Sequence, residues 1–167
     1  MFGIIQKKNS LLRYFFSAIL FFFLVLLVQE INAYIMKVHV GSWFIALKKP
    51  VWNPPGPIFS LVWPLLYLLV SLAGFLLWNE EPSKERGLGR FFWVLQLGFN
   101  SIWSYLFFGL QSPLAGFIGI VLLLICSLFV IFYGRKVHQW IVYAFTPYVL
   151  WLGYAAALNA AIIWMNL

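Results

Sequence analysis

Long stretches without a charged residue alternate with short polar breaks along this chain. A membrane-spanning helix needs about 20 predominantly apolar residues, so these stretches predict five spans. The expected limits are 11–29, 58–78, 91–108, 114–134 and 140–163. The interval 91–134 is too long for one span, and the turn residues GLQSP at 109–113 divide it. The pattern therefore predicts an all-α membrane protein that forms a single five-helix bundle.

The interval 30–57 is the longest connection and ends in the sequence KKPVWNPPGP. Its prolines fix φ near −65° and keep the residues before them out of the α region, so this part is not a helix interior. Aromatic side chains and prolines also argue against disorder. We expect a structured lid over one end of the bundle, carrying Trp52, Pro54 and Pro55.

The first apolar stretch has a second interpretation. Basic residues before a short apolar core are typical of a secretory signal peptide. The candidate cleavage site around Ile31 to Ala33 lacks the paired small residues that cleavage requires. We therefore expect the stretch to remain as the first transmembrane helix.

Composition supports the membrane assignment and suggests an orientation. Of the residues, 64% are hydrophobic and 9% are charged, and the net charge is +7. The basic residues lie at the ends of the apolar stretches, where they set topology, so no nucleic-acid partner is expected. Most of them fall in the N-terminal tail and in the second and fourth loops. The positive-inside rule then places the N-terminus in the cytoplasm, with the first loop and the C-terminus on the opposite side.

Several classes of function are disfavoured by what the spans lack. Apart from Arg13 at the mouth of the first helix, the predicted spans contain no ionisable Asp, Glu, Lys, Arg or His. Such residues mark ion and proton paths, so a pump, a proton-coupled transporter or an intramembrane protease is disfavoured. His39 and His138 lie in predicted loops, no metal site is expected, and Cys126 has no partner for a disulfide. The lack of an internal repeat argues against an inverted-repeat transporter.

Three predicted helices each carry a ridge of aromatic and polar side chains at helical spacing, which places the members of a ridge on one face. The ridges are Phe59, Trp63, Tyr67 and Ser71; Gln96, Asn100, Trp103, Ser104 and Phe107; and Tyr148, Trp151, Ala155, Leu158, Asn159 and Ile162. Interhelical hydrogen bonding explains such ridges without a ligand. We interpret Asn100 and Asn159 in that way, and Trp63 and Trp151 as lining a cavity.

Small residues are frequent in the third, fourth and fifth spans, where they let helices approach closely. They serve either the bundle itself or a dimer seam on the third or the fifth helix, and the sequence does not choose. The residues concerned are Gly98, Gly109, Gly116, Gly119, Gly153, Ala156, Ala157, Ala160 and Ala161.

Three motifs together resemble the translocator protein family, also called tryptophan-rich sensory proteins or peripheral-type benzodiazepine receptors. The first is KPVWNPP followed by F-x-x-V-W-x-x-L-Y at 59–67 and a closing Trp78. The second is Q-L-x-x-N-x-x-W-S-x-L-F-F at 96–108 followed by Pro113, and the third is P-Y-x-x-W-x-x-x-A-x-x-L-N at 147–159 with a final Asn166. The match extends from Trp43 to Asn166.

The resemblance implies a five-helix bundle, usually a homodimer, with a pocket under the first loop. Ligands attributed to the family are porphyrins and haem, sterols and synthetic drugs, and light-dependent breakdown of protoporphyrin is attributed to some members. By motif position, the pocket residues would be Phe59, Trp63, Tyr67, Asn100, Trp103, Phe107, Trp151, Ala155 and Leu158. The pair Trp63 and Trp151 matches the tryptophans linked to that photochemistry. Lys48 and Lys49, beside the lid, would meet the carboxylates of a ligand.

The chain also departs from the family pattern. Pro57 and Leu61 stand where the family commonly has a second tryptophan and a proline. Ala160 and Trp164 replace the aromatic and basic residues of the sterol motif of animal members, so a tetrapyrrole is favoured over a sterol. With both histidines in loops, metal-free porphyrin should bind at least as well as haem.

We therefore expect a multi-pass membrane receptor or sensor that binds a tetrapyrrole or a similar flat, hydrophobic ligand and requires no cofactor. The alternatives are a transporter of such ligands, a photochemical enzyme that degrades porphyrin with Trp63 and Trp151, and a scaffold whose aromatic residues only pack. The sequence favours the receptor over the enzyme.

Overall fold

The computed structural model describes residues 2–167, with side chains from Leu11 onward. Every regular element in that range is helical. The elements are α1 (Phe2–His39), α2 (Ser42–Ala46), α3 (Gly56–Asn79), α4 (Lys84–Ser104), the π-helical η1 (Tyr105–Gly109), α5 (Pro113–Gly134) and α6 (Gln139–Met165). Within residues 11–167, five helical segments are long and apolar enough to cross a membrane, which confirms the predicted fold class. The protein is a multi-pass integral membrane protein.

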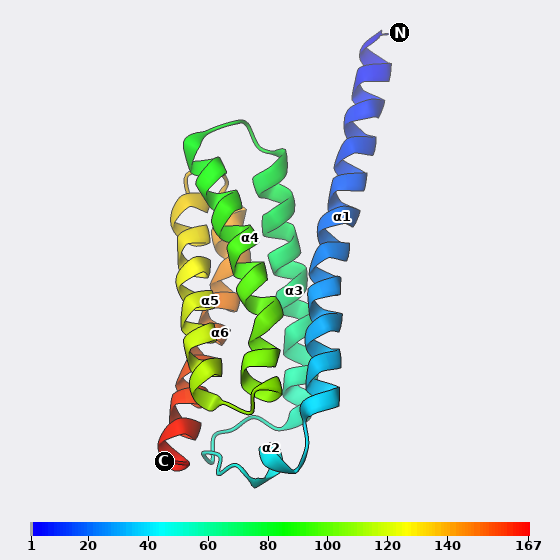
Figure 1. Ribbon diagram of the computed structural model, residues 1–167. Helices are drawn as coiled ribbons and strands as arrows, with labels where there is room; N and C mark the ends of the chain where they lie inside the picture. Colours follow the sequence, from blue (N-terminus) through cyan, green and yellow to red (C-terminus); the bar gives the residue numbers. More distant parts are fainter. Residues whose placement is uncertain (1) are drawn as a thin grey trace.

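The five long helices form a closed ring. Helix α1 packs on α3, α3 on α6, α6 on α5 and α5 on α4, and α4 returns to α1. The loop that contains α2 covers one end of the ring, where the C-terminus also lies, and the N-terminal end of α1 extends past the other helices at the opposite end (Figure 1). The two ends of the chain therefore lie at opposite ends of the bundle, as an odd number of spans requires.

The first helix continues beyond the expected limit at Gln29, so the predicted loop 30–57 is helical as far as His39. The polar residues after Gln29 mark a change in hydrophobicity, but no Pro or Gly stands between Gln29 and Gly41 to interrupt the helix. Only the part from Val40 to Pro55 is a loop, and it contains the short helix α2. Pro50, Pro54 and Pro55 lie in this loop and Pro57 lies in the first turn of α3, so none of the four is in a helix interior, as expected.

The third span also begins earlier than the expected limit at Phe91. Helix α4 starts at Lys84 because Ser83 caps it, its hydroxyl accepting from Arg86 N at 3.0 Å. The polar residues after the cap are compatible with a helix, so the loop between α3 and α4 is shorter than predicted. At its other end the helix widens into η1, where Leu110 N donates to Tyr105 O at 2.8 Å. This wider turn buries two successive side chains, Phe107 and Phe108.

The turn from η1 to α5 is tight, as the sequence GLQSP predicts. Gln111 adopts a φ of 50°, which residues other than glycine adopt infrequently. Ser112 then caps α5 by accepting from Ala115 N at 3.2 Å, and Pro113 occupies the first turn. The short connection holds α4 and α5 side by side.

Candidate functional site

Aromatic side chains from α3 and α6 meet directly beneath the first loop. The indole rings of Trp63 and Trp151 stand edge to face with their centroids 6.4 Å apart. Trp63 stacks on Tyr67 at 5.4 Å, one turn further along α3, and Phe59 contacts Trp151 at 5.7 Å, one turn earlier. The i+4 spacing on α3 therefore builds one wall of this cluster, and a single tryptophan of α6 completes it.

A second group of buried aromatic side chains lies beside the first. Phe107 of η1 stacks on Trp103 of α4 at 5.5 Å. Phe107 and Leu158 are buried together in one cluster, against which Phe59 and Trp103 pack. Trp103 also packs against the main core that contains Tyr67, as Trp63, Trp151 and Ala155 do, and so it connects the two groups.

The first loop closes over this second group. Trp43 and Phe44, at the start of the loop, contact Phe107 with ring centroids 5.7 and 6.2 Å apart. Phe44 also contacts Phe108 at 5.3 Å. The loop thus covers the aromatic residues with its own aromatic residues, and its early part acts as the lid that the sequence suggested for the proline-rich part.

The proline-rich part of the loop is held by the end of α6. Tyr154 donates its phenolic proton to the carbonyl of Trp52 at 2.7 Å, and the two rings lie 5.7 Å apart. Asn166 accepts from Lys48 N at 3.0 Å and donates to Lys48 O at 2.9 Å. These contacts fix the lid to the C-terminal end of the chain, while the rings of Pro54 and Pro55 stiffen its backbone.

The two lysines of the lid differ in their surroundings. Lys49 Nζ donates to the carbonyls of Phe44 and Leu47 and lies 4.3 Å from the centroid of the Phe44 ring, so its charge serves the loop itself. The side chain of Lys48 is exposed, and only its backbone is held, by Asn166. Lys48 is therefore the better placed of the two to meet a carboxylate.

Asn100 is the centre of a buried hydrogen-bond network beneath the aromatic cluster. Tyr67 donates to Asn100 Oδ1 at 2.8 Å, and Asn100 Nδ2 donates to Tyr148 at 2.8 Å. Asn32 of α1 also donates to Asn100 Oδ1, at 3.0 Å. Tyr148 in turn donates to Gln96 Oε1 at 3.2 Å. One amide thus connects α1, α3, α4 and α6, which supports the interpretation of Asn100 as an interhelical contact.

Asn159 also joins helices. With its amide turned so that Nδ2 faces Pro113, it donates to the Pro113 carbonyl at 3.0 Å and accepts from Phe117 N at 3.0 Å. Gly116 lies beside it, and a Cβ there would come within 2.6 Å of Phe107. Trp103 Nε1 donates to the Gly116 carbonyl at 3.0 Å. The small residues at the start of α5 therefore serve the bundle, by admitting the aromatic residues of α4 and η1.

Two buried donors in this region have no hydrogen-bond partner among the described residues. They are the indole Nε1 of Trp151 and the amide Nε2 of Gln96. Buried polar groups in proteins are almost always paired, so each unpaired one needs an explanation. The Trp151 N–H belongs to the aromatic cluster itself, and an acceptor on a bound molecule would reach it only after the neighbouring rings move.

The predicted pocket residues are therefore brought together, with Asn100 below the rings and Ala155 beside them. The rings contact one another, so a flat ligand would have to move them apart. The sequence did not single out Asn32, Tyr154 or Gln29 as site residues. Gln29 and Asn32 stand three residues apart at the end of an apolar run. This spacing places both amides on one helix face and could have indicated them as site residues.

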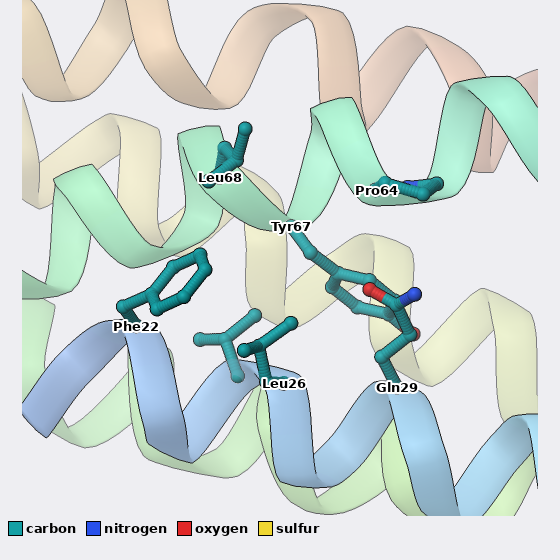
Figure 2. A pocket seen from close by; sticks show the side chains of 7 residues that line it. Phe22, Leu26, Gln29, Pro64, Tyr67 and Leu68 are labelled. Carbon is teal, nitrogen blue, oxygen red and sulfur yellow. The ribbon is translucent and has the colours of Figure 1, made fainter. Parts of the chain in front are cut away.

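Gln29 lines a cleft between α1 and α3 with a volume of ≈ 160 Å³. Of the predicted site residues, only Tyr67 borders it, and Figure 2 shows Gln29 reaching from α1 toward Tyr67 and Pro64 of α3. The cleft thus meets the Trp63–Trp151 cluster only at Tyr67, which stacks on Trp63.

Comparison with known proteins shows which family the sequence belongs to. The TspO/MBR family profile matches residues 18–165. The chain is 38% identical to the tryptophan-rich protein TspO of Archaeoglobus fulgidus over 128 residues, covering 76% of this chain and 82% of the relative. It is 36% identical to protein CrtK of Rhodobacter capsulatus over 130 residues (75% and 79%), and 31% identical to the translocator protein of Ovis aries over 119 residues (70% of each chain). The chain therefore belongs to the TspO/MBR family.

Proposed function

We propose that the protein is a membrane receptor or sensor that binds a tetrapyrrole, such as protoporphyrin or haem, between Trp63 and Trp151 under the first loop. The family relationship supports a sensory role, since one relative, from Cereibacter sphaeroides, is named tryptophan-rich sensory protein. The proposal rests chiefly on one observation, the edge-to-face pair of Trp63 and Trp151 in which the buried Trp151 N–H has no partner among the described residues.

The physical chemistry of a porphyrin suits this place. A flat aromatic macrocycle stacks on indole rings, and each aromatic pair adds about 0.5 to 1.5 kcal/mol beyond the burial of apolar area. The Trp151 N–H can donate to an acceptor on the macrocycle or on its substituents. The propionates would extend toward the exposed Lys48 at the lid. Binding requires the contacting rings to separate, and the lid residues Trp43 and Phe44 would move with Phe107.

The test is a titration of the purified protein with protoporphyrin in detergent, in the dark, followed by tryptophan fluorescence. We expect saturable quenching at micromolar concentration or below. The double variant Trp63→Phe, Trp151→Phe should bind about tenfold more weakly, which corresponds to about 1.4 kcal/mol.

The matched control is the double variant Trp140→Phe, Trp164→Phe. It also removes two indoles, but from side chains that are 61% and 80% exposed on the surface of α6. It should bind as the wild type does. Non-saturable quenching that is equal in all three proteins would mean partitioning into detergent and would refute the tetrapyrrole assignment.

Further measurements distinguish two other functions from the proposed receptor. A photochemical enzyme would consume bound protoporphyrin under illumination, and Trp63→Phe or Trp151→Phe alone would abolish the product while leaving binding intact. A transporter would move a labelled porphyrin across liposome membranes. The receptor proposal predicts neither turnover nor flux.

We further propose that the protein is a homodimer. A Cβ added at Gly98 of α4 or at Gly153 of α6 would have no described atom within 4 Å beyond the backbone of its own helix, unlike one at Gly116 or Gly119, whose neighbours lie inside the bundle. Both open positions leave space for a second copy. Light scattering of the detergent-solubilised protein tests this, and a monomeric protein mass after subtraction of the detergent would refute it.

A further inference from the structure

The cleft between α1 and α3 opens toward the lipid-facing surface of the bundle. Phe22 and Leu26 of α1 form one side of it, and Pro64 and Leu68 of α3 form the other (Figure 2). Phe22 is 39% exposed and Leu68 is 48% exposed, so a molecule dissolved in the bilayer can reach the opening. The inner wall is the ring of Tyr67, whose hydroxyl donates to Asn100 Oδ1.

Among the described residues that line this cleft, Gln29 and Tyr67 carry polar side chains, and the Tyr67 hydroxyl already donates to Asn100. Gln29 Oε1 is buried and has no hydrogen-bond partner between residues 11 and 167, so the amide has to turn toward the opening to meet a ligand. Burying an amide without a hydrogen bond is unfavourable, and more so where water is excluded. An unpaired amide at the edge of an otherwise apolar cleft therefore indicates a missing partner.

The size of the cleft limits what can enter. Its ≈ 160 Å³ is close to the roughly 150 Å³ of an apolar cavity that holds a benzene molecule. A tetrapyrrole is far too large, so this cleft does not duplicate the aromatic cluster. A small aliphatic or single-ring group fits.

We propose that this cleft binds a small apolar alcohol or phenol from the bilayer, with its hydroxyl hydrogen-bonded to the Gln29 amide. A hydroxyl both donates and accepts, so it satisfies the amide whichever way its oxygen and nitrogen face. A charged group would meet no counter-charge among the residues that line the cleft, and a plain hydrocarbon would leave the amide unpaired. The hydroxyl therefore distinguishes the preferred ligand from the lipid chains around it.

Photolabelling of the purified full chain with a diazirine-bearing octanol tests this proposal. Labelled peptides are mapped by mass spectrometry, and unlabelled 1-octanol or octane is added as competitor. We expect labelling within 22–29 and 64–68, and we expect 1-octanol to compete about fivefold better than octane, as one hydrogen bond allows. Gln29→Leu should retain labelling but make the two competitors equal.

Leu26→Trp should fill the cleft and reduce its labelling at least tenfold. The matched control is Leu27→Trp, because Leu27 neighbours it on α1 but does not line the cleft and is 59% exposed. Phe22→Trp is a second filling variant if Leu26→Trp fails to fold, which its thermal transition will show.

Equal competition by octane and 1-octanol in the wild type would overturn the proposal, as would labelling that both filling variants leave unchanged. The protoporphyrin titration is read separately. Loss of protoporphyrin binding would refute the proposed function and leave the alcohol site standing. Failure of the photolabelling test would refute the alcohol site and leave the proposed function standing.

Discussion

The hydroxyl of Tyr67 donates to Asn100 Oδ1 at 2.8 Å and so joins α3 to α4 in the middle of the bundle. Asn100 Oδ1 accepts a second hydrogen bond from Asn32 of α1, and Asn100 Nδ2 donates one to Tyr148 of α6. The same amide therefore holds four of the five spans beneath the aromatic cluster.

Replacing Asn100 by Leu should destabilise the protein. The change leaves the buried Tyr67 hydroxyl unpaired, for which we expect a loss of about 1 to 3 kcal/mol in the free energy of unfolding. Thermal unfolding in detergent, followed by circular dichroism, measures the loss. The control is Ser101→Ala, because the Ser101 hydroxyl bonds only to the carbonyl of Leu97 in its own helix. Equal transitions in the two variants would show that the network adds no net stability.

Gly74→Ala should destabilise the contact between α3 and α4. A Cβ at Gly74 would lie 2.5 Å from Trp93 Cζ2, and Trp93 is fixed by its hydrogen bond to the Val70 carbonyl at 3.0 Å. Overpacking of this kind costs about 1 to 3 kcal/mol. Chemical or thermal unfolding in detergent provides the measurement.

The matched control is Gly87→Ala in α4, where no atom lies within 4 Å of the added Cβ. Alanine favours the helix by about 1 kcal/mol over glycine at such a position, so this variant should gain stability. We expect the free energy of unfolding to fall in Gly74→Ala and to rise in Gly87→Ala. A rise in both variants would contradict the close packing of Gly74 on Trp93.

The lid should loosen when its attachment to α6 is removed. Tyr154→Phe deletes the hydrogen bond to the Trp52 carbonyl, and Asn166→Ala deletes both bonds to the Lys48 backbone. We expect the Lys48 amide to exchange its hydrogen at least several-fold faster in Asn166→Ala, and protoporphyrin to dissociate faster from both variants. Hydrogen exchange read by mass spectrometry and stopped-flow fluorescence are the measurements.

Tyr143→Phe is the control for the lid variants, because the Tyr143 hydroxyl accepts from Gln139 near the start of α6, at the other end of the helix. It should leave exchange in the loop unchanged. If Asn166→Ala also leaves the exchange of Lys48 at the wild-type rate, the Asn166 contact does not hold the lid.

The orientation predicted from the basic residues can be tested with single cysteines. Val51 in the lid and Glu81 in the loop between α3 and α4 are both exposed, and they lie at opposite ends of the bundle. In intact cells, Val51→Cys should react with a membrane-impermeant maleimide, whereas Glu81→Cys should react only after permeabilisation. The wild type is the control, because its single Cys126 is buried. If Glu81→Cys reacted in intact cells and Val51→Cys only after permeabilisation, the orientation would be the opposite of the predicted one.

The sequence by itself determined the five spans, the structured first loop and the inward ridges on α3, α4 and α6. Hydrophobic length and helical periodicity are local properties, so they can be read along the chain. The family motifs then assigned the aromatic residues of these ridges to a candidate pocket. The ends of helices were less predictable, because α1 continues past Gln29 and α4 starts at Lys84. A polar break marks where the membrane ends, and a helix ends only at a cap or a breaker.

Only the tertiary structure decided which side chains meet. The ring order of the helices, the pairing of Trp63 with Trp151, and the attachment of the lid to Tyr154 and Asn166 all depend on how the helices are rotated and shifted against each other. Two amides on α1 show the same dependence. Asn32 joins the Asn100 network, while Gln29, one turn earlier, faces a cleft, and its Oε1 has no partner among the described residues. Their spacing is visible in the sequence, but the neighbour that each one meets is set by helix packing.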